Sequence, residues 1–236
     1  MLAADALGPT ICIGEILVEV MAQTVGQGFQ EPLPLIGPFP SGAPAIFLSQ
    51  CGRMGGQAAM IGAVGADDFG ALNLSRLRAD GVDVSAVAVD PDWPTGSAFV
   101  RYRGDGARDF VFNITRSAAA RLDWTASVAA LVARAGHLHV MGSALTMPPA
   151  RKLIARAADL ICARGGSLSL DPNLRKELTV DAEAEALFQR LLDMACLLLP
   201  SGDELFRAAG TGPDEAQAVT ALTARGIGEI ALKRGA

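Results

Sequence analysis

The sequence lacks the features of secreted, membrane-spanning and nucleic-acid-binding proteins. Its four cysteines are widely spaced among 236 residues and form no Cys-x-x-Cys pair, so we expect reduced thiols in the core. No apolar run reaches the roughly 18 residues that a membrane span needs, and no basic segment precedes an apolar run as in a signal peptide. The net charge of −5 argues against nucleic acid or an anionic membrane as the main partner. We therefore expect a cytoplasmic protein that binds small molecules.

Two common nucleotide-binding motifs are also missing. The sequence has no Walker A motif, and no G-x-G-x-x-G follows a strand pattern, so a P-loop NTPase or a standard dinucleotide-binding fold is disfavoured. The two histidines, His137 and His139, share one face of a predicted strand, but neither a carboxylate nor a cysteine lies near them in sequence. A structural role is therefore favoured over a metal site.

What the sequence does contain is enough apolar residues, 50%, for the full core of an α/β protein. From residue 56 onward, short apolar patterns alternate with amphipathic ones. The apolar patterns predict strands at 58–64, 137–141, 167–170, 196–199 and 229–233. The amphipathic patterns predict helices at 70–79, 124–135, 149–163, 182–195, 203–209 and 214–225. Continuous apolar strands between helices predict a mostly parallel sheet that is covered on both faces.

Two segments break this alternation. Residues 95–102 and 108–113 predict strands, and the loop between them contains Asp105-Gly106, a strong hairpin signal. Residues 18–40 also lack a helix pattern. We expect both segments to form a small β-layer that stands off the main sheet.

Polar residues follow three of the predicted strands, in segments 171–175 (DPNLR), 201–204 (SGDE) and 234–236 (RGA). The carboxyl ends of parallel strands meet at one edge of a sheet, where ligands bind. Cations, backbone donors and a carboxylate placed together are what phosphoryl transfer requires. Arg175 is the strongest candidate because a guanidinium can grip a phosphate in two places, although a turn with an incidental surface arginine is the alternative. Ser201 with Glu204 also fits a simple capping box.

Residues 41–70 place a glycine-bearing loop before a helix that is predicted from Pro44, with an apolar run of Ala45, Ile46, Leu48 and Ser49 as its buried face. Such a loop presents free backbone N–H groups to an anion or a sugar hydroxyl. This stretch resembles the N-terminal signature of the PfkB/ribokinase family of sugar kinases, in which Gly42 and residues 62–70 (GAVGADDFG) match. Ser41 replaces the first glycine of that signature, and Ile46 stands where the family has asparagine, which removes one expected sugar contact.

Further segments carry the same resemblance in family order. Residues 171–175 resemble the DPNxR segment of 2-keto-3-deoxygluconate kinases and fructokinases, 201–204 the Asn-x-x-Glu segment, and 229–236 the strand before the adenine site. Residues 11–19 resemble the first strand of the family. The resemblance implies a single ribokinase-like domain over 1–236, with a three-layer α/β/α fold. It also implies a small β lid at about 18–40 and 95–113, which is often the surface of a homodimer.

The resemblance also implies ATP and Mg²⁺ as cofactors and assigns roles to residues. The implied sugar-binding residues are Glu19, Gly42, Ala43, Arg101, Arg103, Asn113, Arg116, Asp171 and Arg175. The implied nucleotide-binding residues are Asn173, Arg175, Ser201, Lys233 and Gly235, with Glu204 acting indirectly on Mg²⁺ and Arg175 contacting the transferring phosphate. The alternative for the lid arginines is a solvated surface, and for Glu19 an exposed strand position. Ketodeoxygluconate kinases carry Tyr-Tyr-Arg in the lid where this chain has Val-Phe-Asn at 111–113, which weakens that substrate.

No Gly-x-Gly-Asp occurs in the sequence. The family carries Gly-Ala-Gly-Asp beyond the strand that here ends at Lys233, and its aspartate is the catalytic base. We therefore expect a C-terminally truncated chain without that aspartate. Three functions stay open. The first is an ATP-dependent kinase for a primary hydroxyl of a ketose or keto-sugar acid, namely 2-keto-3-deoxygluconate, fructose or tagatose. The second is a non-catalytic sugar- or nucleotide-binding fragment. The third is a Rossmann-like oxidoreductase.

Overall fold

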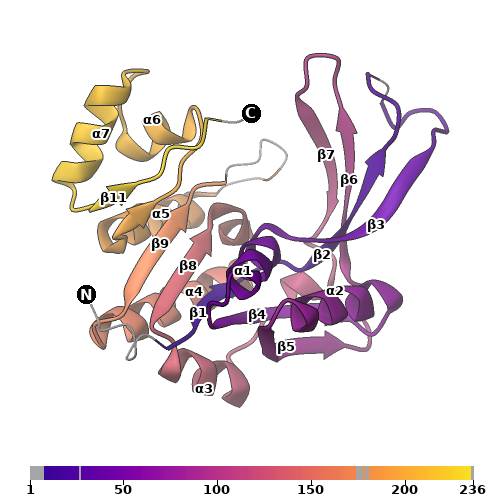
Figure 1. The fold of residues 1–236 in the computed structure, drawn as a ribbon, viewed down its shortest axis with the longest axis horizontal. Helices are drawn as coiled ribbons and strands as arrows, with labels where there is room; N and C mark the ends of the chain where they lie inside the picture. Colours follow the sequence, from indigo (N-terminus) through magenta and orange to yellow (C-terminus); the bar gives the residue numbers. More distant parts are fainter. Residues whose placement is uncertain (1–7, 27, 174–177, 179–180, 235–236) are drawn as a thin grey trace.

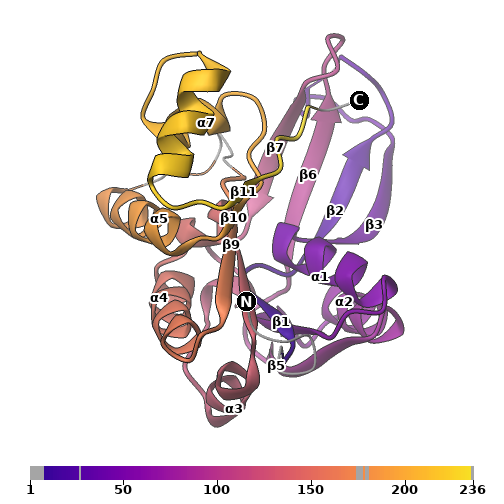
Figure 2. The same cartoon turned by 60° about the vertical axis from the view of Figure 1, so that its left-hand side comes forward.

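The computed structural model describes residues 8–26, 28–173, 178 and 181–234. The chain forms a seven-stranded sheet with the order β11-β10-β9-β8-β1-β4-β5 and a four-stranded sheet with the order β3-β2-β6-β7. All strand pairs of the larger sheet are parallel. We call the smaller sheet the lid, because its strands project beyond the carboxyl ends of β8 and β9 (Figures 1 and 2). The predicted α/β fold with a mostly parallel sheet and a small β lid is confirmed.

The bounds of the elements are as follows. The larger sheet contains β1 (Thr10–Ile13), β4 (Ala58–Gly65), β5 (Val82–Asp90), β8 (His137–Met141), β9 (Ser167–Asp171), β10 (Leu197–Leu198) and β11 (Glu229–Ile230). The lid contains β2 (Leu17–Ala22), β3 (Leu35–Ser41), β6 (Gly96–Tyr102) and β7 (Arg108–Asn113). The helices are α1 (Ala43–Arg53), α2 (Asp68–Ala79), α3 (Ala126–Arg134), α4 (Pro148–Ala163), α5 (Ala182–Met194), α6 (Glu204–Ala209) and α7 (Glu215–Ala224), with 3-10 turns η2 (Ala118–Ala120) and η3 (Gly142–Thr146).

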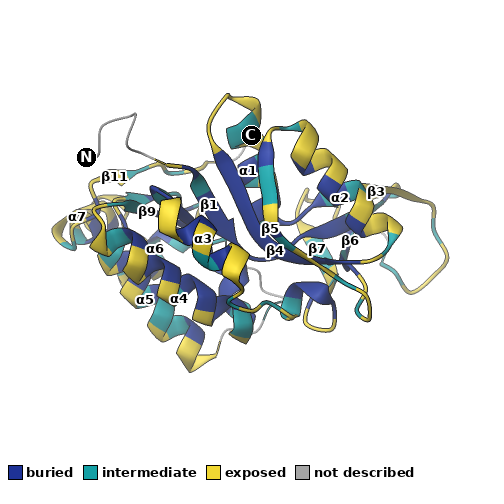
Figure 3. Cartoon of the chain, turned by 90° about the horizontal axis from the view of Figure 1, so that it is seen from below, coloured by how far each residue is buried: buried dark blue, intermediate teal, exposed yellow. Residues whose placement is uncertain are grey.

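Helices cover both faces of the main sheet. Helices α1 and α2 lie on one face, and α3, α4 and α5 lie on the other (Figure 3). The alternation of side chains along each strand supplies a core on both sides. In β1, Ile11 and Ile13 pack into the cluster on the α4 side, whereas Cys12 packs against Leu48 on the α1 side. The result is a three-layer structure.

Local sequence sets the helix starts. Asp67 caps α2 by accepting a hydrogen bond from the backbone N–H of Gly70 at 2.8 Å. The same carboxylate accepts bonds from the backbone N–H and the hydroxyl of Thr95 at 2.8 and 2.7 Å. Because Thr95 directly precedes β6, this cap also fixes the base of the lid against the main sheet.

The structure corrects several predicted elements. Residues 11–19 form two strands in two different sheets, because the chain crosses from the main sheet to the lid at Gly14. A Cβ at Gly14 would lie 2.8 Å from Pro44 and 2.9 Å from Ala144, so the crossing requires glycine. Strand β5 was not predicted, and the last strand is limited to Glu229–Ile230. Ile46, expected on a buried helix face, is 53% exposed.

The cysteines do not all lie in the core as expected. Cys12 is buried, Cys51 and Cys162 are half-buried, and Cys196 is exposed because it precedes a short strand near the end of the sheet. Among the described residues, none of the helices is both long and apolar enough to cross a membrane.

Candidate functional site

The three polar segments predicted from the sequence meet at the carboxyl edge of the main sheet. Asp171 ends β9, Ser201 follows β10, and Lys233 follows β11, where it forms an isolated parallel bridge with Ser201. The ammonium of Lys233 lies 2.6 Å from the Asp171 carboxylate. Residues more than sixty positions apart in the chain are therefore joined by one ion pair at this edge.

Asp171 is held in an unusual electrostatic environment. It is 8% exposed, and this burial raises the pKa of its carboxyl group, although the hydrogen bond and the charge of Lys233 act in the opposite direction. The nearby charge of Glu204 adds to the rise in that pKa. A second cation beside these two carboxylates would therefore be stabilised.

A chain of hydrogen bonds continues from Asp171 toward the lid. The backbone N–H of Asn173 donates to Asp171 at 3.1 Å, and its side-chain amide donates to the Ser143 hydroxyl at 3.2 Å. Ser143, in turn, donates to Glu15 at 2.7 Å. We call the five residues Lys233, Asp171, Asn173, Ser143 and Glu15 the strand-end network, because they follow or end β11, β9, β8 and β1.

Close approach of two loops makes this network possible. Gly142 precedes Ser143, and a Cβ at that position would lie 1.8 Å from the carbonyl oxygen of Pro172. Asn173 adopts a positive φ of 39°. Asparagine tolerates this conformation better than most residues, which suits it to the turn after β9. Neither Ser143 nor Glu15 was predicted as a site residue, because the partners that give each its place in the network are distant in sequence.

A cavity of about 140 Å³ lies between the strand-end network and the lid. We call it the lid cavity. Polar groups on its walls come from Glu15, Glu19, Ser143, Asn173 and Arg108. Its apolar wall is formed mainly by Phe110 and Phe112, whose rings stack with centroids 5.0 Å apart. Carboxylates and amides facing an apolar wall suit a small polyhydroxylated molecule, which presents both hydroxyls and C–H groups.

The first turn of α1 closes another side of the lid cavity. Gly42 and Ala43 both line it, as does Ser41. Gly42 is the N-cap of α1 with φ of 107°, and a Cβ there would lie 2.5 Å from the carbonyl oxygen of Glu15. No side chain caps this helix end, so its first backbone N–H groups remain available to a ligand oxygen. Gly42, Ala43 and Glu19, which the sequence predicted as sugar contacts, thus all line the lid cavity.

The lid arginines predicted as sugar ligands lie elsewhere. Alternate residues of β7, Arg108, Phe110 and Phe112, line the cavity, so Asp109 and Asn113 point to the opposite face. On that face, Asp109 pairs with Arg101 at 3.1 Å and with Arg103 at 2.7 Å.

Asn113 donates instead to the Ser97 hydroxyl at 3.3 Å. Arg116 is exposed beyond β7 and is not among the residues that line the lid cavity. Sequence reasoning missed Arg108, although it alternates with Phe110 and Phe112 along the strand, which was a usable signal.

A larger, open cavity of about 480 Å³ lies beyond Ser201 and Lys233. Glu204 folds back on Ser201 and accepts bonds from its N–H at 2.8 Å and its hydroxyl at 2.7 Å. Helix α6 nevertheless has Asp203 as its N-cap, so Ser201 does not cap the helix as the predicted capping box required. Ser201 lines the cavity. Of the other predicted residues, Arg175 and Gly235 lie outside the described part of the chain.

The two carboxylates at this edge fit Mg²⁺ only in company with a phosphate ligand. Among the described residues, three or more His, Cys, Asp or Glu side chains do not gather into a metal-binding group. Mg²⁺ keeps several waters and commonly binds through one or two carboxylates together with substrate phosphates. Asp171 and Glu204, close enough for the charge of one to raise the pKa of the other, match that second pattern.

The histidines are engaged inside the sheet. Both ring nitrogens of His137 contact serine hydroxyls of β9, Ser167 and Ser169, at 2.7 Å. The Nδ1 atom of His139 contacts Ser169 at 2.6 Å, and its ring stacks on Phe47 of α1 with centroids 3.6 Å apart. Burial lowers the pKa of His137 to about 4 and that of His139 to about 3. These contacts give both rings a structural role.

Several solved structures resemble the chain in fold. The chain resembles an E. coli protein provisionally named Ribokinase II, with a TM-score of 0.89 and 38% identity over 97% of this chain and 73% of that one. The same E. coli protein has been solved in complex with ATP and Mg²⁺, with a TM-score of 0.86. A fructokinase from Vibrio cholerae O395 in a fructose-, ADP- and potassium-bound form has a TM-score of 0.77 at 26% identity, covering 98% of this chain and 71% of that one.

Proteins that are similar in sequence include plant and bacterial fructokinases. Fructokinase-1 of Oryza sativa subsp. japonica is 34% identical over 196 residues, which cover 83% of this chain and 60% of that protein. The fructokinase of Salmonella typhimurium is 31% identical over 221 residues, covering 93% of this chain and 68% of that protein. The chain thus spans about three fifths of the plant relative's length. The model of the pfkB family of carbohydrate kinases matches residues 12–236. On this match, and on the fold and site that accompany it, the chain belongs to the pfkB family of carbohydrate kinases.

Proposed function

We propose that this protein is an ATP-dependent sugar kinase that phosphorylates a primary hydroxyl of a ketose or keto-sugar acid. Fructose is the first candidate, because the fructokinases named above are similar over most of this chain. Tagatose and 2-keto-3-deoxygluconate are the other two. The observation that carries the proposal is the strand-end network, which joins the lid cavity to the edge bearing Lys233 and Ser201.

In this proposal, each wall of the lid cavity contacts a different part of the sugar. Glu19 accepts hydrogen bonds from sugar hydroxyls, and the free N–H groups after Gly42 donate to a sugar oxygen. The stacked rings of Phe110 and Phe112 cover the apolar face of the sugar. Asn173 lies between the sugar and the nucleotide edge and orients the acceptor hydroxyl.

At the nucleotide edge, Lys233 and Ser201 would contact phosphate oxygens, and Asp171 and Glu204 would hold Mg²⁺. Arg175, which lies outside the described residues, stays a predicted phosphate contact. Mg²⁺ would supply charge neutralisation on the transferring phosphate. The ion pair between Lys233 and Asp171 keeps the lysine side chain directed at this edge before a nucleotide binds.

The second candidate is sugar or nucleotide binding without catalysis. It rests on the lid cavity and on the open cavity beside Ser201 and Lys233, which account for ligand binding without naming a catalytic base. The alternative of a Rossmann-like oxidoreductase is set aside by the family match.

One experiment separates the two candidates. Each of the three sugars is titrated into the protein by calorimetry, and ADP release is then assayed in the same sample with ATP and Mg²⁺. Sugar binding with sugar-dependent ADP release supports the kinase. Sugar binding without ADP release supports the binding protein, and no binding of any of the three sugars rejects the proposed substrate class.

Two further features complete the proposal. We place the protein in the cytoplasm, in line with cysteines that are free in the described structure. We also propose a homodimer through the lid, supported by exposed Leu35, Ile36, Phe39 and Val111 on its strands. Sedimentation of wild type and of a Val111→Glu variant tests the dimer, which the added charge should dissociate.

A further inference from the structure

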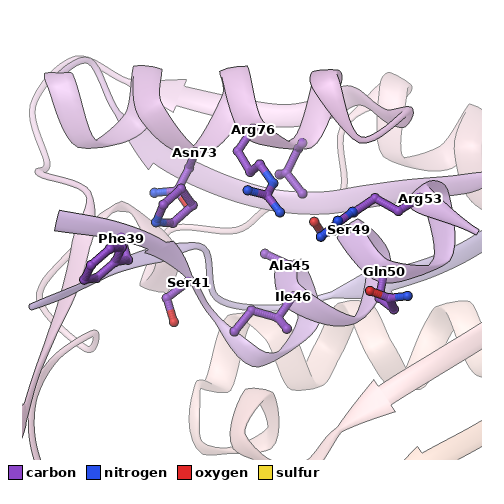
Figure 4. A pocket seen from close by; sticks show the side chains of 11 residues that line it. Phe39, Ser41, Ala45, Ile46, Ser49, Gln50, Arg53, Asn73 and Arg76 are labelled. Atoms are coloured by element: carbon purple, nitrogen blue, oxygen red, sulfur yellow. The ribbon is translucent and has the colours of Figure 1, made fainter. Parts of the chain in front are cut away.

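A third cavity, of about 270 Å³, lies between α1, α2 and β3. We call it the α1–α2 cavity. Figure 4 shows side chains from all three elements around it, with Arg53 and Arg76 toward one end and Phe39 toward the other. Ser41 and Ile46 border both this cavity and the lid cavity. The two cavities are therefore neighbours, but neither the strand-end network nor the nucleotide edge contributes to this one.

The wall on α2 contains a buried polar group. Asn73 is 1% exposed, and its side-chain N–H donates to the backbone carbonyl of Phe69 at 2.9 Å. The side-chain oxygen of the same amide is a hydrogen-bond acceptor. Since Asn73 lines the cavity, a hydroxyl on a bound molecule can supply the donor.

The other end of the cavity is cationic. Arg76 forms an ion pair with Asp80 through its Nε atom, and the Nε atom of Arg53 lies 4.0 Å from the same carboxylate. Asp80 also accepts a hydrogen bond from Ser49. Two guanidinium groups face one carboxylate, so the cluster has a net positive charge. Among the described residues, neither arginine donates through its terminal Nη atoms, which leaves planar donors for a phosphate or carboxylate.

We propose that the α1–α2 cavity binds a small hydroxylated organic anion, a sugar phosphate or a sugar acid, at a site distinct from the lid cavity. The anionic group contacts Arg53 and Arg76, and a hydroxyl donates to Asn73. Phe39 and Leu77 pack against the carbon skeleton.

Calorimetry on the whole protein tests this site. Fructose 1-phosphate and gluconate are the two probes, with inorganic phosphate as the probe for the anion alone. We expect saturable binding of at least one organic probe, and the probe that binds distinguishes the phosphate from the carboxylate. Arg53→Glu should weaken that binding by at least about tenfold, because it replaces a cation with an anion at the site.

Two matched charge reversals complete the test. Arg78→Glu changes an exposed residue of α2 that does not line the cavity, and Arg108→Glu changes the mouth of the lid cavity. Arg78→Glu should change the affinity for the probe by less than about twofold. Arg108→Glu identifies any part of the binding that occurs in the lid cavity. The proposal is overturned if no organic probe binds, if Arg53→Glu and Arg78→Glu have equal effects, or if Arg108→Glu alone removes binding, which would place the anion in the lid cavity.

A crystal of wild-type protein soaked with the bound probe gives a readout that does not depend on any variant folding. Density between Arg53 and Arg76 supports the site, and density only in the lid cavity rejects it. Phosphorylation of a sugar does not require the α1–α2 cavity, so failure of this proposal leaves the proposed kinase activity intact.

Discussion

The carboxyl edge of the main sheet and the lid border the same cavity, but they hold their polar side chains in different ways. At the edge, the five residues of the strand-end network bond to one another across strands far apart in sequence. In the lid, Arg108 lies on the face that lines the cavity and is exposed. Arg101 and Arg103, which form ion pairs with Asp109, lie on the opposite, outer face. The polar groups of the edge are thus preorganised by their mutual hydrogen bonds. The lid supplies an apolar wall and one exposed guanidinium that is free to change its rotamer.

The largest loss of activity should follow from removing the ion pair between Lys233 and Asp171. Lys233→Met leaves the buried Asp171 carboxylate beside Glu204 without its cation. We expect ATP-dependent phosphorylation to fall by about 100-fold, because a phosphate contact is lost as well. The free energy of unfolding should fall by about 1–2 kcal/mol, a modest loss because the Lys233 side chain is 43% exposed.

Steady-state kinetics and urea unfolding measure both effects. The matched control is Arg234→Gln, in the next residue, whose side chain is 70% exposed and pairs with Glu215. Equal activity losses in the two variants would show that the ion pair has no special role.

A smaller effect is expected at the centre of the strand-end network. Ser143→Ala removes one hydroxyl that accepts from Asn173 and donates to Glu15. Losing it should cost about 1–2 kcal/mol of transition-state stabilisation, or about 5- to 30-fold in kcat/KM. Ser117→Ala is the control, since that buried serine donates to the carbonyl of Ile114 outside the network. Kinetics of the two variants would contradict the account if Ser117→Ala were the more damaging.

Substitutions on the two faces of the lid test which face contacts the sugar. Arg108→Gln should raise KM for a sugar acid by about 3- to 10-fold with kcat little changed, because the side chain meets the substrate at the cavity mouth. Arg103→Gln, on the outer face, should leave KM within about twofold although it breaks an ion pair. The reverse order of effects would mean that the register of β7 does not decide which side chains reach the sugar.

The smallest effect on activity at neutral pH is expected from the histidines of the main sheet, but stability should depend on them in acid. Their folded pKa values, about 4 and about 3, lie below the unfolded value of 6.5. The unfolded chain therefore binds more protons below pH 6.5, and stability is lost as the pH falls toward 4. Between pH 7 and 5, His139→Gln should lose about 1–2 kcal/mol less than wild type, as measured by urea unfolding. Parallel pH profiles would contradict this.

The sequence predicted the sheet edge better than the lid, for physical reasons. Continuous apolar strands such as 167–170 mark a parallel sheet, and whatever polar residues follow them must meet at one edge. Asp171, Ser201 and Lys233 therefore came together as predicted. Strand β5 escaped prediction because it is an edge strand that mixes buried and exposed positions, so it lacks a continuous apolar run.

The lid hairpin was predicted from its turn, but the side chains that face the cavity were not predicted. A shift of one residue in a strand moves every side chain to the other face. The sequence alone does not show which alternate side chains of β7 face the cavity. Asn113 and Arg101, both predicted as sugar contacts, lie on the face of the lid that points away from the lid cavity. Ser143 was missed because it follows an apolar strand and gains its meaning only from Glu15 and Asn173, which are distant in sequence.

Calorimetric titration of fructose into wild type, Glu19→Gln and Arg103→Gln tests the central claim most directly. The account predicts saturable binding to wild type, a loss of affinity of about tenfold or more in Glu19→Gln, and wild-type affinity in Arg103→Gln. Fructose that fails to bind, or that binds Glu19→Gln and wild type equally well, would show that the space between the strand-end network and the lid is not the sugar site.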